Sequence, residues 1–257
     1  MHDESRLASV AGIYREWRPV GPLADHLACT WMNALPESAT PPLQIIPDGC
    51  IDIVWTGESL RVAGPDTQPI FESFAAGTVI LGVRFLPGAA PPWLGVPAAE
   101  IVNDRVPLQE FWGHDARHLA DRLREVPNAS RAGDLILSAL ASRSPLPSLI
   151  DPAARAVAHA FARDEGDRVR LSELTATLGL SERTLRRRCE NAFGYGPKTL
   201  QRILRFQQFL RLLRRSPVPG LAELAAASGF ADQAHLTREV RSLGGLTPTA
   251  FMRRPAA

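Results

Sequence analysis

Short runs of β-branched and aromatic residues fill the chain from residue 10 to about residue 95. Four of these runs predict strands, because turn-forming Pro, Gly and Asp residues separate them. They cover residues 44–46, 50–55, 60–63 and 78–85. Closely spaced short strands are typical of a small β-barrel or sandwich.

The pattern then changes to helical spacing. Apolar residues three and four positions apart predict helices over residues 115–126 and 131–142. Two such helices beside a β-domain have two open roles: they cover one side of the barrel, or they form a dimer surface.

A proline-rich segment, residues 144–152, separates this half from a second half with a helical pattern throughout. Asp151 and Pro152 predict the start of a helix. Further helices are predicted over residues 171–178, 182–193, 197–214, 220–227, 232–243 and 247–253. The predicted fold is α+β with two domains. Residues 1–146 form a small β-barrel or sandwich with two flanking helices, and residues 152–254 are all-α.

Two segments of the second half, residues 171–194 and 220–245, have the pattern of a helix-turn-helix. In the first, Gly179 supplies the left-handed backbone that ends one helix, and Ser181 caps the next. Gly229 and Asp232 have the same roles in the second. Each module then holds its second helix on the surface. The connector helix between them, residues 197–214, would be about 25 Å long.

Charge divides the chain at the same place. Residues 1–150 carry 11 Arg and Lys against 17 Asp and Glu, a net charge of −6. Residues 151–257 carry 18 against 10, a net charge of +8. A basic domain is typical of a polyanion-binding surface, because its cations replace the counterions of a phosphate backbone.

Composition adds few constraints. With 45% hydrophobic and 22% charged residues, the chain is like ordinary globular proteins. Its apolar runs all fall short of the roughly 20 residues needed to span a bilayer. The N-terminus is polar rather than signal-like, and the three cysteines are widely spaced. Reduced thiols and a cytoplasmic location are therefore expected.

Both modules resemble those of AraC/XylS-type regulators. Residues 229–238, 245–248 and Phe251 are similar to the second module of that family. The first module and the connector are matched by residues 181–185, Arg187, Gly194, Pro197 and Arg205. Cys189, Leu200 and Val240 depart from the family pattern, but at inward positions that affect packing rather than function. The resemblance implies a transcriptional regulator that binds double-stranded operator DNA.

The resemblance also implies roles for exposed side chains of the two recognition helices. Arg183, Thr184, Gln233 and His235 are the predicted base readers, because Arg pairs well with guanine and Gln with adenine. Arg187 and Arg238 are predicted to clamp phosphates. The predicted DNA-binding set is completed by Ser181, Arg188 and Asp232. In the alternative, the arginines form a solvated face or internal salt bridges.

The first half resembles a domain that accompanies a subset of these regulators, at residues 47–55, 82–89 and 106–113. By analogy it would bind a small-molecule effector and mediate a homodimer. The expected partners are therefore operator DNA, an effector, a second copy of the chain and RNA polymerase. No membrane, cofactor or metal is expected.

All five tryptophans lie in this half, and aromatic walls with a few polar anchors favour a small-ligand pocket. The candidate ligand-binding residues are Trp17, Trp31, Asp48, Cys50, Trp55, Arg84 and Trp93. In the alternative, the tryptophans fill the core and Arg84 pairs with Asp48 or Asp52.

Other chemistries find little support in the sequence. His26, Cys29, Asp48, Cys50 and Asp52 do not have the spacing of a known metal site. The sequence has no phosphate loop and no HExxH motif, so no catalytic residue is predicted. The alternative function is an enzyme or repair protein that uses the helical modules to localise on DNA.

Overall fold

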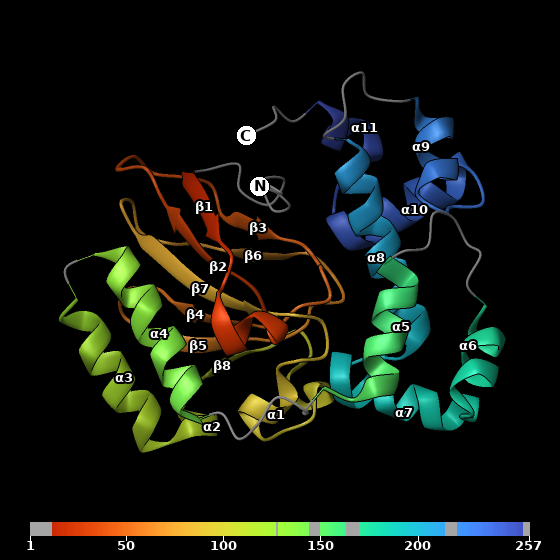
Figure 1. The fold of residues 1–257 in the computed structure, drawn as a ribbon. Coiled ribbons are helices and arrows are strands. Elements are labelled where there is room, and N and C mark those ends of the chain that lie inside the picture. Colours follow the sequence, from red (N-terminus) through yellow and green to blue (C-terminus); the bar gives the residue numbers. More distant parts are fainter. Residues whose placement is uncertain (1–11, 127, 144–149, 163–169, 214–219, 254–257) are drawn as a thin grey trace.

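The computed structural model of the chain describes residues 12–126, 128–143, 150–162, 170–213 and 220–253. A β-rich part and a helical part lie side by side, and α5 (Pro152–Ala162) begins the helical part (Figure 1). The predicted α+β fold with two domains is confirmed. The division between residues 146 and 152 stays a prediction, because residues 144–149 lie outside the described ranges.

The β-rich part contains a six-stranded antiparallel sheet and a two-stranded sheet. The strand order of the large sheet is β1-β2-β7-β4-β5-β8. In that order its strands are Ile13–Trp17, Leu27–Ala34, Val79–Phe85, Asp52–Trp55, Leu60–Ala63 and Arg105–Pro107. The small sheet pairs β3 (Leu43–Ile45) with β6 (Ile70–Glu72). Within the described residues β1 and β8 each pair on one side only. The large sheet is therefore open, so of the two predicted forms, barrel or sandwich, a closed barrel is not formed.

Successive side chains along a strand of the large sheet point to opposite faces. From β7, Leu81, Val83 and Phe85 join an apolar core, which α3 (His114–Arg124) and α4 (Ala129–Arg143) complete. Ile80 and Arg84 of the same strand line a cavity on the other face. The two predicted helices thus cover one face of the sheet, and β3 and β6 lie across the other (Figure 1).

Four predicted strands are present as β3, β4, β5 and β7, but the sequence pattern does not reveal β1, β2, β6 or β8. β2 mixes Cys, Thr and Asn with its apolar residues, and the other three strands are at most five residues long. None of these four strands shows a clear alternation of apolar and polar residues in its sequence. The short helical turns of this part also escape the pattern: η1 (Gly21–Asp25), α1 (Pro91–Leu94), η2 (Ala98–Ile101) and α2 (Gln109–Trp112).

The helical part contains the predicted helices and turns. They are α6 (Leu171–Leu178), α7 (Glu182–Phe193), α8 (Pro197–Leu212), α9 (Leu221–Ala227), α10 (Gln233–Gly244) and α11 (Pro248–Met252). Gly179 ends α6 with a φ of 63°, a conformation that glycine adopts without steric cost. Both modules share one apolar core, which contains Leu185, Phe206, Phe209, Leu236 and Phe251. This shared core fixes the two recognition helices, α7 and α10, to the connector α8.

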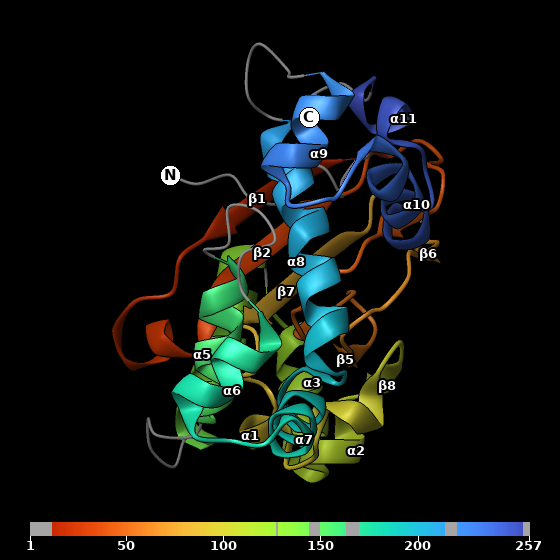
Figure 2. The same cartoon turned by 90° about the vertical axis from the view of Figure 1, so that its right-hand side faces the viewer.

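The two parts also contact each other, and α8 passes in front of the strands in Figure 2. Gln207 Nε2 of α8 donates to the carbonyl oxygen of Pro47 at 2.6 Å. Gln44 Nε2 of β3 donates to the carbonyl oxygen of Gly244, the last residue of α10, at 2.7 Å. Ile46 is buried in the core of the helical part. None of the described helices is long and apolar enough to cross a membrane.

Candidate nucleic-acid interface and effector pocket

The first recognition helix, α7, begins at a side-chain cap. Ser181 Oγ accepts a hydrogen bond from the Thr184 backbone N–H at 3.2 Å. Leu185, Cys189 and Phe193 point into the core, as predicted. Arg183 and Arg187 are exposed, so their guanidinium groups are free to meet a nucleic acid. Thr184 is half-buried beside the cap, where its hydroxyl lies 2.9 Å from that of Ser181.

Arg188 differs from the other arginines predicted to bind DNA. It is half-buried, and its Nη1 lies 3.2 Å from Oδ2 of Asp151. Asp151 in turn caps α5, because its Oδ1 accepts from the backbone N–H groups of Ala153 and Ala154. This geometry favours the alternative, in which Arg188 is an internal salt-bridge partner that holds α5 to α7.

The second recognition helix, α10, has the same construction. Asp232 Oδ1 accepts from the His235 backbone N–H at 2.6 Å. Gln233 and Arg238 are exposed. The His235 ring is directed back to the turn: its Nδ1 accepts from the Ala231 N–H at 3.3 Å, and it packs edge-on against Phe230. Gln233 and Arg238 are thus the most accessible of the predicted residues on this helix. Base reading and phosphate clamping by these residues stay predictions.

The three departures from the family pattern are all packing positions. Cys189, Leu200 and Val240 are fully buried. Burial raises the pKa of the Cys189 thiol to about 12. The departures therefore leave the exposed faces of α7 and α10 unchanged.

A second candidate site lies between the two sheets of the β-rich part. It is a cavity of about 170 Å³, lined by both sheets and, from α8, by Gln207 and Leu210. Its walls combine aromatic rings of Tyr14, Trp31 and Phe74 with seven charged side chains. The cavity is therefore built jointly by the β-rich part and the connector between the DNA-binding modules.

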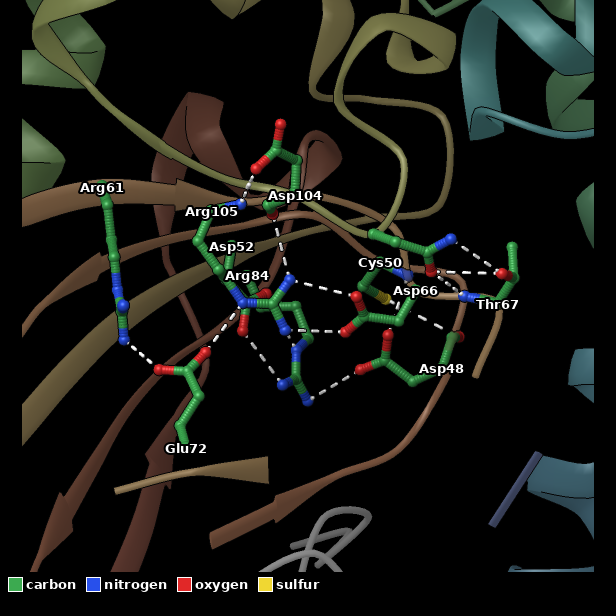
Figure 3. Close-up of polar contacts among 11 residues, drawn as sticks. Asp48, Cys50, Asp52, Arg61, Asp66, Thr67, Glu72, Arg84, Asp104 and Arg105 are labelled. Carbon is green, nitrogen blue, oxygen red and sulfur yellow. Dashed lines mark hydrogen bonds and ion pairs between the residues drawn. The ribbon is translucent and has the colours of Figure 1, made fainter. Parts of the chain in front are cut away.

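Arg84 of β7 is the centre of one ion network in this cavity (Figure 3). Its Nε and Nη2 donate to the two carboxylate oxygens of Asp52 at 3.1 and 3.0 Å. Its Nη1 lies 3.4 Å from Asp48 Oδ2. Trp31 Nε1 also donates to Asp52, at 3.0 Å. Desolvation lowers the pKa of Arg84, but the carboxylates of Asp52 and Asp48 raise it by more, so the guanidinium stays charged.

Arg105 is the centre of a neighbouring network. Its Nη1 and Nη2 donate to the carboxylate of Asp66 at 3.0 and 2.8 Å, and its Nε donates to Glu72 at 2.8 Å. Arg61 also donates to Glu72. Figure 3 shows Arg61 of β5 and Arg105 of β8 converging on Glu72, with Arg84 and its carboxylates beside them. Charges taken out of water need such partners, since an isolated buried ion is costly.

The structure brings four of the seven predicted ligand-binding residues to the cavity: Trp31, Asp48, Cys50 and Arg84. Trp55 and Trp93 lie in the core on the opposite face of the large sheet, as the alternative expected. Trp17 is 45% exposed on the edge strand β1. The predicted pairing of Arg84 with Asp48 or Asp52 occurs with both residues.

Sequence reasoning did not find the second ion network. Arg61 interrupts the apolar run of β5 in the same way that Arg84 interrupts β7, and this signal could have identified it. Asp66 lies in the loop after β5, and Glu72 and Arg105 lie in three-residue strands. Their local pattern gives no sign of burial.

Neither a metal site nor a reactive thiol is formed by the residues His26, Cys29, Asp48, Cys50 and Asp52. No cluster of His, Cys, Asp and Glu suited to a metal occurs among the residues that the structure describes. Desolvation raises the pKa of the Cys29 and Cys50 thiols, and the Asp48 carboxylate adds to the effect at Cys50. Both thiols are therefore protonated and weakly nucleophilic at neutral pH.

Models of known protein families match both parts of the chain. A family model for a helix-turn-helix domain matches residues 174–254. Another, for a domain of unknown function (DUF6597), matches residues 15–107. No curated protein matches the sequence.

Solved structures give distant likenesses. The C-terminal domain of AraT, a response regulator from Geobacillus stearothermophilus, is 20% identical, with 41% of this chain and 88% of that chain covered and a TM-score of 0.38. ToxT from Vibrio cholerae is 12% identical, with 94% and 98% covered and a TM-score of 0.46. ToxT with a bound unsaturated fatty acid is 9% identical, with 96% of each chain covered and a TM-score of 0.47.

The two family matches agree with the motifs of the recognition helices and with those of the β-rich part. The helical part therefore carries a helix-turn-helix domain over residues 174–254, and the β-rich part carries a DUF6597 domain over residues 15–107.

Proposed function

We propose that the chain is a sequence-specific DNA-binding transcriptional regulator, controlled by a small molecule that binds in the cavity between its two sheets. The observation that carries the DNA-binding role is the pair of capped recognition helices. Each has exposed Arg or Gln side chains, and one shared core fixes both to the connector. Two helices fixed in this way suit successive major-groove segments of one DNA site.

Control by a small molecule follows from the walls of the cavity. Gln44 lines it and bonds to the end of α10, and Gln207 lines it and joins α8 to Pro47. A molecule that displaces either side chain alters a contact between the two parts. A ligand shifts an equilibrium only through such differential contacts.

We also propose that the chain has no catalytic activity of its own and works in the cytoplasm. The protonated, weakly nucleophilic state of Cys50 argues against the repair-protein alternative. A homodimer and contact with RNA polymerase stay predictions of the family resemblance.

Selection from a random library of double-stranded DNA tests the central proposal. The purified full chain should enrich a sequence with two conserved elements about one helical turn apart, roughly 10 base pairs, because each recognition helix reads one of them. Cys50→Ala protein should enrich the same sequence. Failure of the unaltered chain to enrich any sequence would contradict the proposal, and so would loss of enrichment on replacing Cys50.

The hydrogen bond between Gln44 and Gly244 gives a test of the coupling. We expect Gln44→Ala to raise the affinity for the selected DNA by on the order of fivefold, because it releases a restraint on α10 equivalent to one buried hydrogen bond, about 1 kcal/mol. Fluorescence anisotropy with labelled DNA measures the change. Gln109→Ala, at an exposed glutamine of α2, is the matched control. An unchanged affinity in Gln44→Ala would exclude coupling through this bond. A lower affinity would show that the bond does not hold α10 back from DNA.

A further inference from the structure

The charges that line the cavity do not balance. Four carboxylates, those of Asp48, Asp52, Asp66 and Glu72, face three guanidinium groups, those of Arg61, Arg84 and Arg105. Each arginine already binds at least one of the carboxylates. An incoming anion would add to the excess of negative charge. A cation would remove the excess.

Asp48 is the carboxylate with the most unused bonding capacity. Its Oδ1 accepts from the Cys50 N–H at 2.9 Å. Its Oδ2 lies 3.4 Å from Arg84, whereas both oxygens of Asp52 lie closer to that arginine. The side chain is 30% exposed, the most accessible of the four carboxylates. Burial raises the pKa of Asp66 in spite of its hydrogen bonds from Arg105, and the carboxylates of Asp48 and Glu72 add to the rise, which agrees with an excess of negative charge in the cavity.

The remaining walls also suit a cation with an apolar body. Trp31 lies directly on Gly82, where a Cβ atom would come within 2.1 Å of the indole. The absence of a side chain at Gly82 therefore makes room for this ring. Tyr14 stacks on Trp31 with ring centroids 6.0 Å apart, and aromatic faces attract cations. Asn33 is 4% exposed and lines the cavity, and its buried Oδ1 accepts no hydrogen bond from the described residues. It offers a second acceptor for an N–H group.

The volume of the cavity sets the size of the ligand. An apolar cavity of about 150 Å³ holds a benzene molecule, and this one measures about 170 Å³. A molecule of roughly eight non-hydrogen atoms is therefore the scale to expect.

Building on the proposed function, we propose that the effector is a compact organic cation, an amine or amidine. Its N–H groups donate to Asp48, and its apolar body lies along the ring of Trp31. Asp48 is half-buried at the cavity wall and is the most accessible of the four carboxylates, which makes it the residue that selects charge. Arg84 and Arg105 hold the other carboxylates in place.

Matched probes test this charge selection. Isothermal titration calorimetry of the full chain, without DNA and at constant ionic strength, compares benzylamine and benzamidine with benzyl alcohol and benzoate. These probes are similar in size and differ in charge. The two cations should bind about tenfold or more tightly than benzyl alcohol, because a desolvated cation gains both the carboxylate and the aromatic face. Benzoate should bind more weakly than either cation. Tighter binding of benzoate, or no measurable binding of either cation, would overturn the proposal.

Two variants test whether Asp48 is responsible for the preference for cations. Asp48→Asn keeps the shape of the side chain and should reduce the affinity for benzylamine about tenfold, with little change for benzyl alcohol. Asp25→Asn makes the same change at an exposed residue of η1 and should leave both affinities unchanged. Equal benzylamine affinity in Asp48→Asn and the unaltered chain would refute the role of Asp48. Circular dichroism confirms that both variants fold. Since no DNA is present, failure here leaves the DNA selection experiment to decide the proposed function separately.

Discussion

Replacement of Arg84 by methionine will destabilise the β-rich part by about 3–5 kcal/mol, because it leaves the buried carboxylate of Asp52 without its main partner. Asp52 is 8% exposed, and from the described residues its carboxylate would keep only the hydrogen bond from Trp31. The loss is large beside the 5–15 kcal/mol that stabilises a typical domain. Chemical denaturation followed by tryptophan fluorescence measures it. All five tryptophans lie between residues 17 and 112, so this signal reports on the β-rich part alone.

Two further variants separate the ion network from a general effect of losing an arginine. Arg117→Met, at an exposed position of α3, should change the unfolding free energy by less than about 0.5 kcal/mol. The double variant Arg84→Met/Asp52→Leu should regain most of the stability lost in Arg84→Met, because an apolar pair of similar volume often replaces a buried ion pair without loss. A destabilisation of Arg84→Met no larger than that of Arg117→Met would show that the network contributes nothing to stability.

The features that the sequence predicted are those fixed by neighbouring residues. The cap at Ser181 and the φ of 63° at Gly179 involve contacts within one turn of the chain, so spacing alone identifies them. The same is true of the inward positions of α7 and α10. The apolar runs of β4, β5 and β7 are also local, because each alternates between the two faces of the large sheet.

The features that escaped prediction depend on long-range contacts. Arg105 and Asp66 are 39 residues apart. Gln44 and Gly244 are 200 apart. The arrangement of the strands brings Arg105 to Asp66, and the packing of β3 against α10 brings Gln44 to Gly244. A strand pattern specifies neither arrangement. Trp55 and Trp93 show the same limit, because composition placed them near a pocket while the sheet directs them to its other face.

The difference between local and long-range contacts also separates the two sites of the chain. The proposed DNA-binding surface is built from local motifs within residues 171–245, whereas the cavity depends on both parts of the chain. Gln207 and Leu210 of α8 line the cavity. Gln44 of β3 also lines it and donates a hydrogen bond to Gly244 of α10. A change in the effector would therefore require changes only in the carboxylates and rings of the cavity, and the residues that read DNA could stay the same.

Arg183→Ala and Gln233→Ala should each weaken binding to the selected DNA by about 1–3 kcal/mol and relax the base preference at one position, because each would remove a predicted bidentate contact with a base edge. Arg238→Ala should instead weaken binding to all sequences to a similar extent. It should also reduce the slope of log affinity against log salt concentration by about 1, since it removes one phosphate contact. Affinities measured at several salt concentrations, on the selected sequence and on single-base variants, distinguish the two classes.

The exposure of these side chains is what makes the experiment decisive. Arg183, Gln233 and Arg238 have no ion pair in the described part of the chain, so their removal should leave the free energy of unfolding nearly unchanged. Arg188→Ala provides the contrast, because it breaks the pair with Asp151 and should lower stability without altering base preference. If Arg183→Ala weakens all sequences equally, as Arg238→Ala is expected to do, then α7 clamps the backbone rather than reading bases. Base preference would then depend on α10.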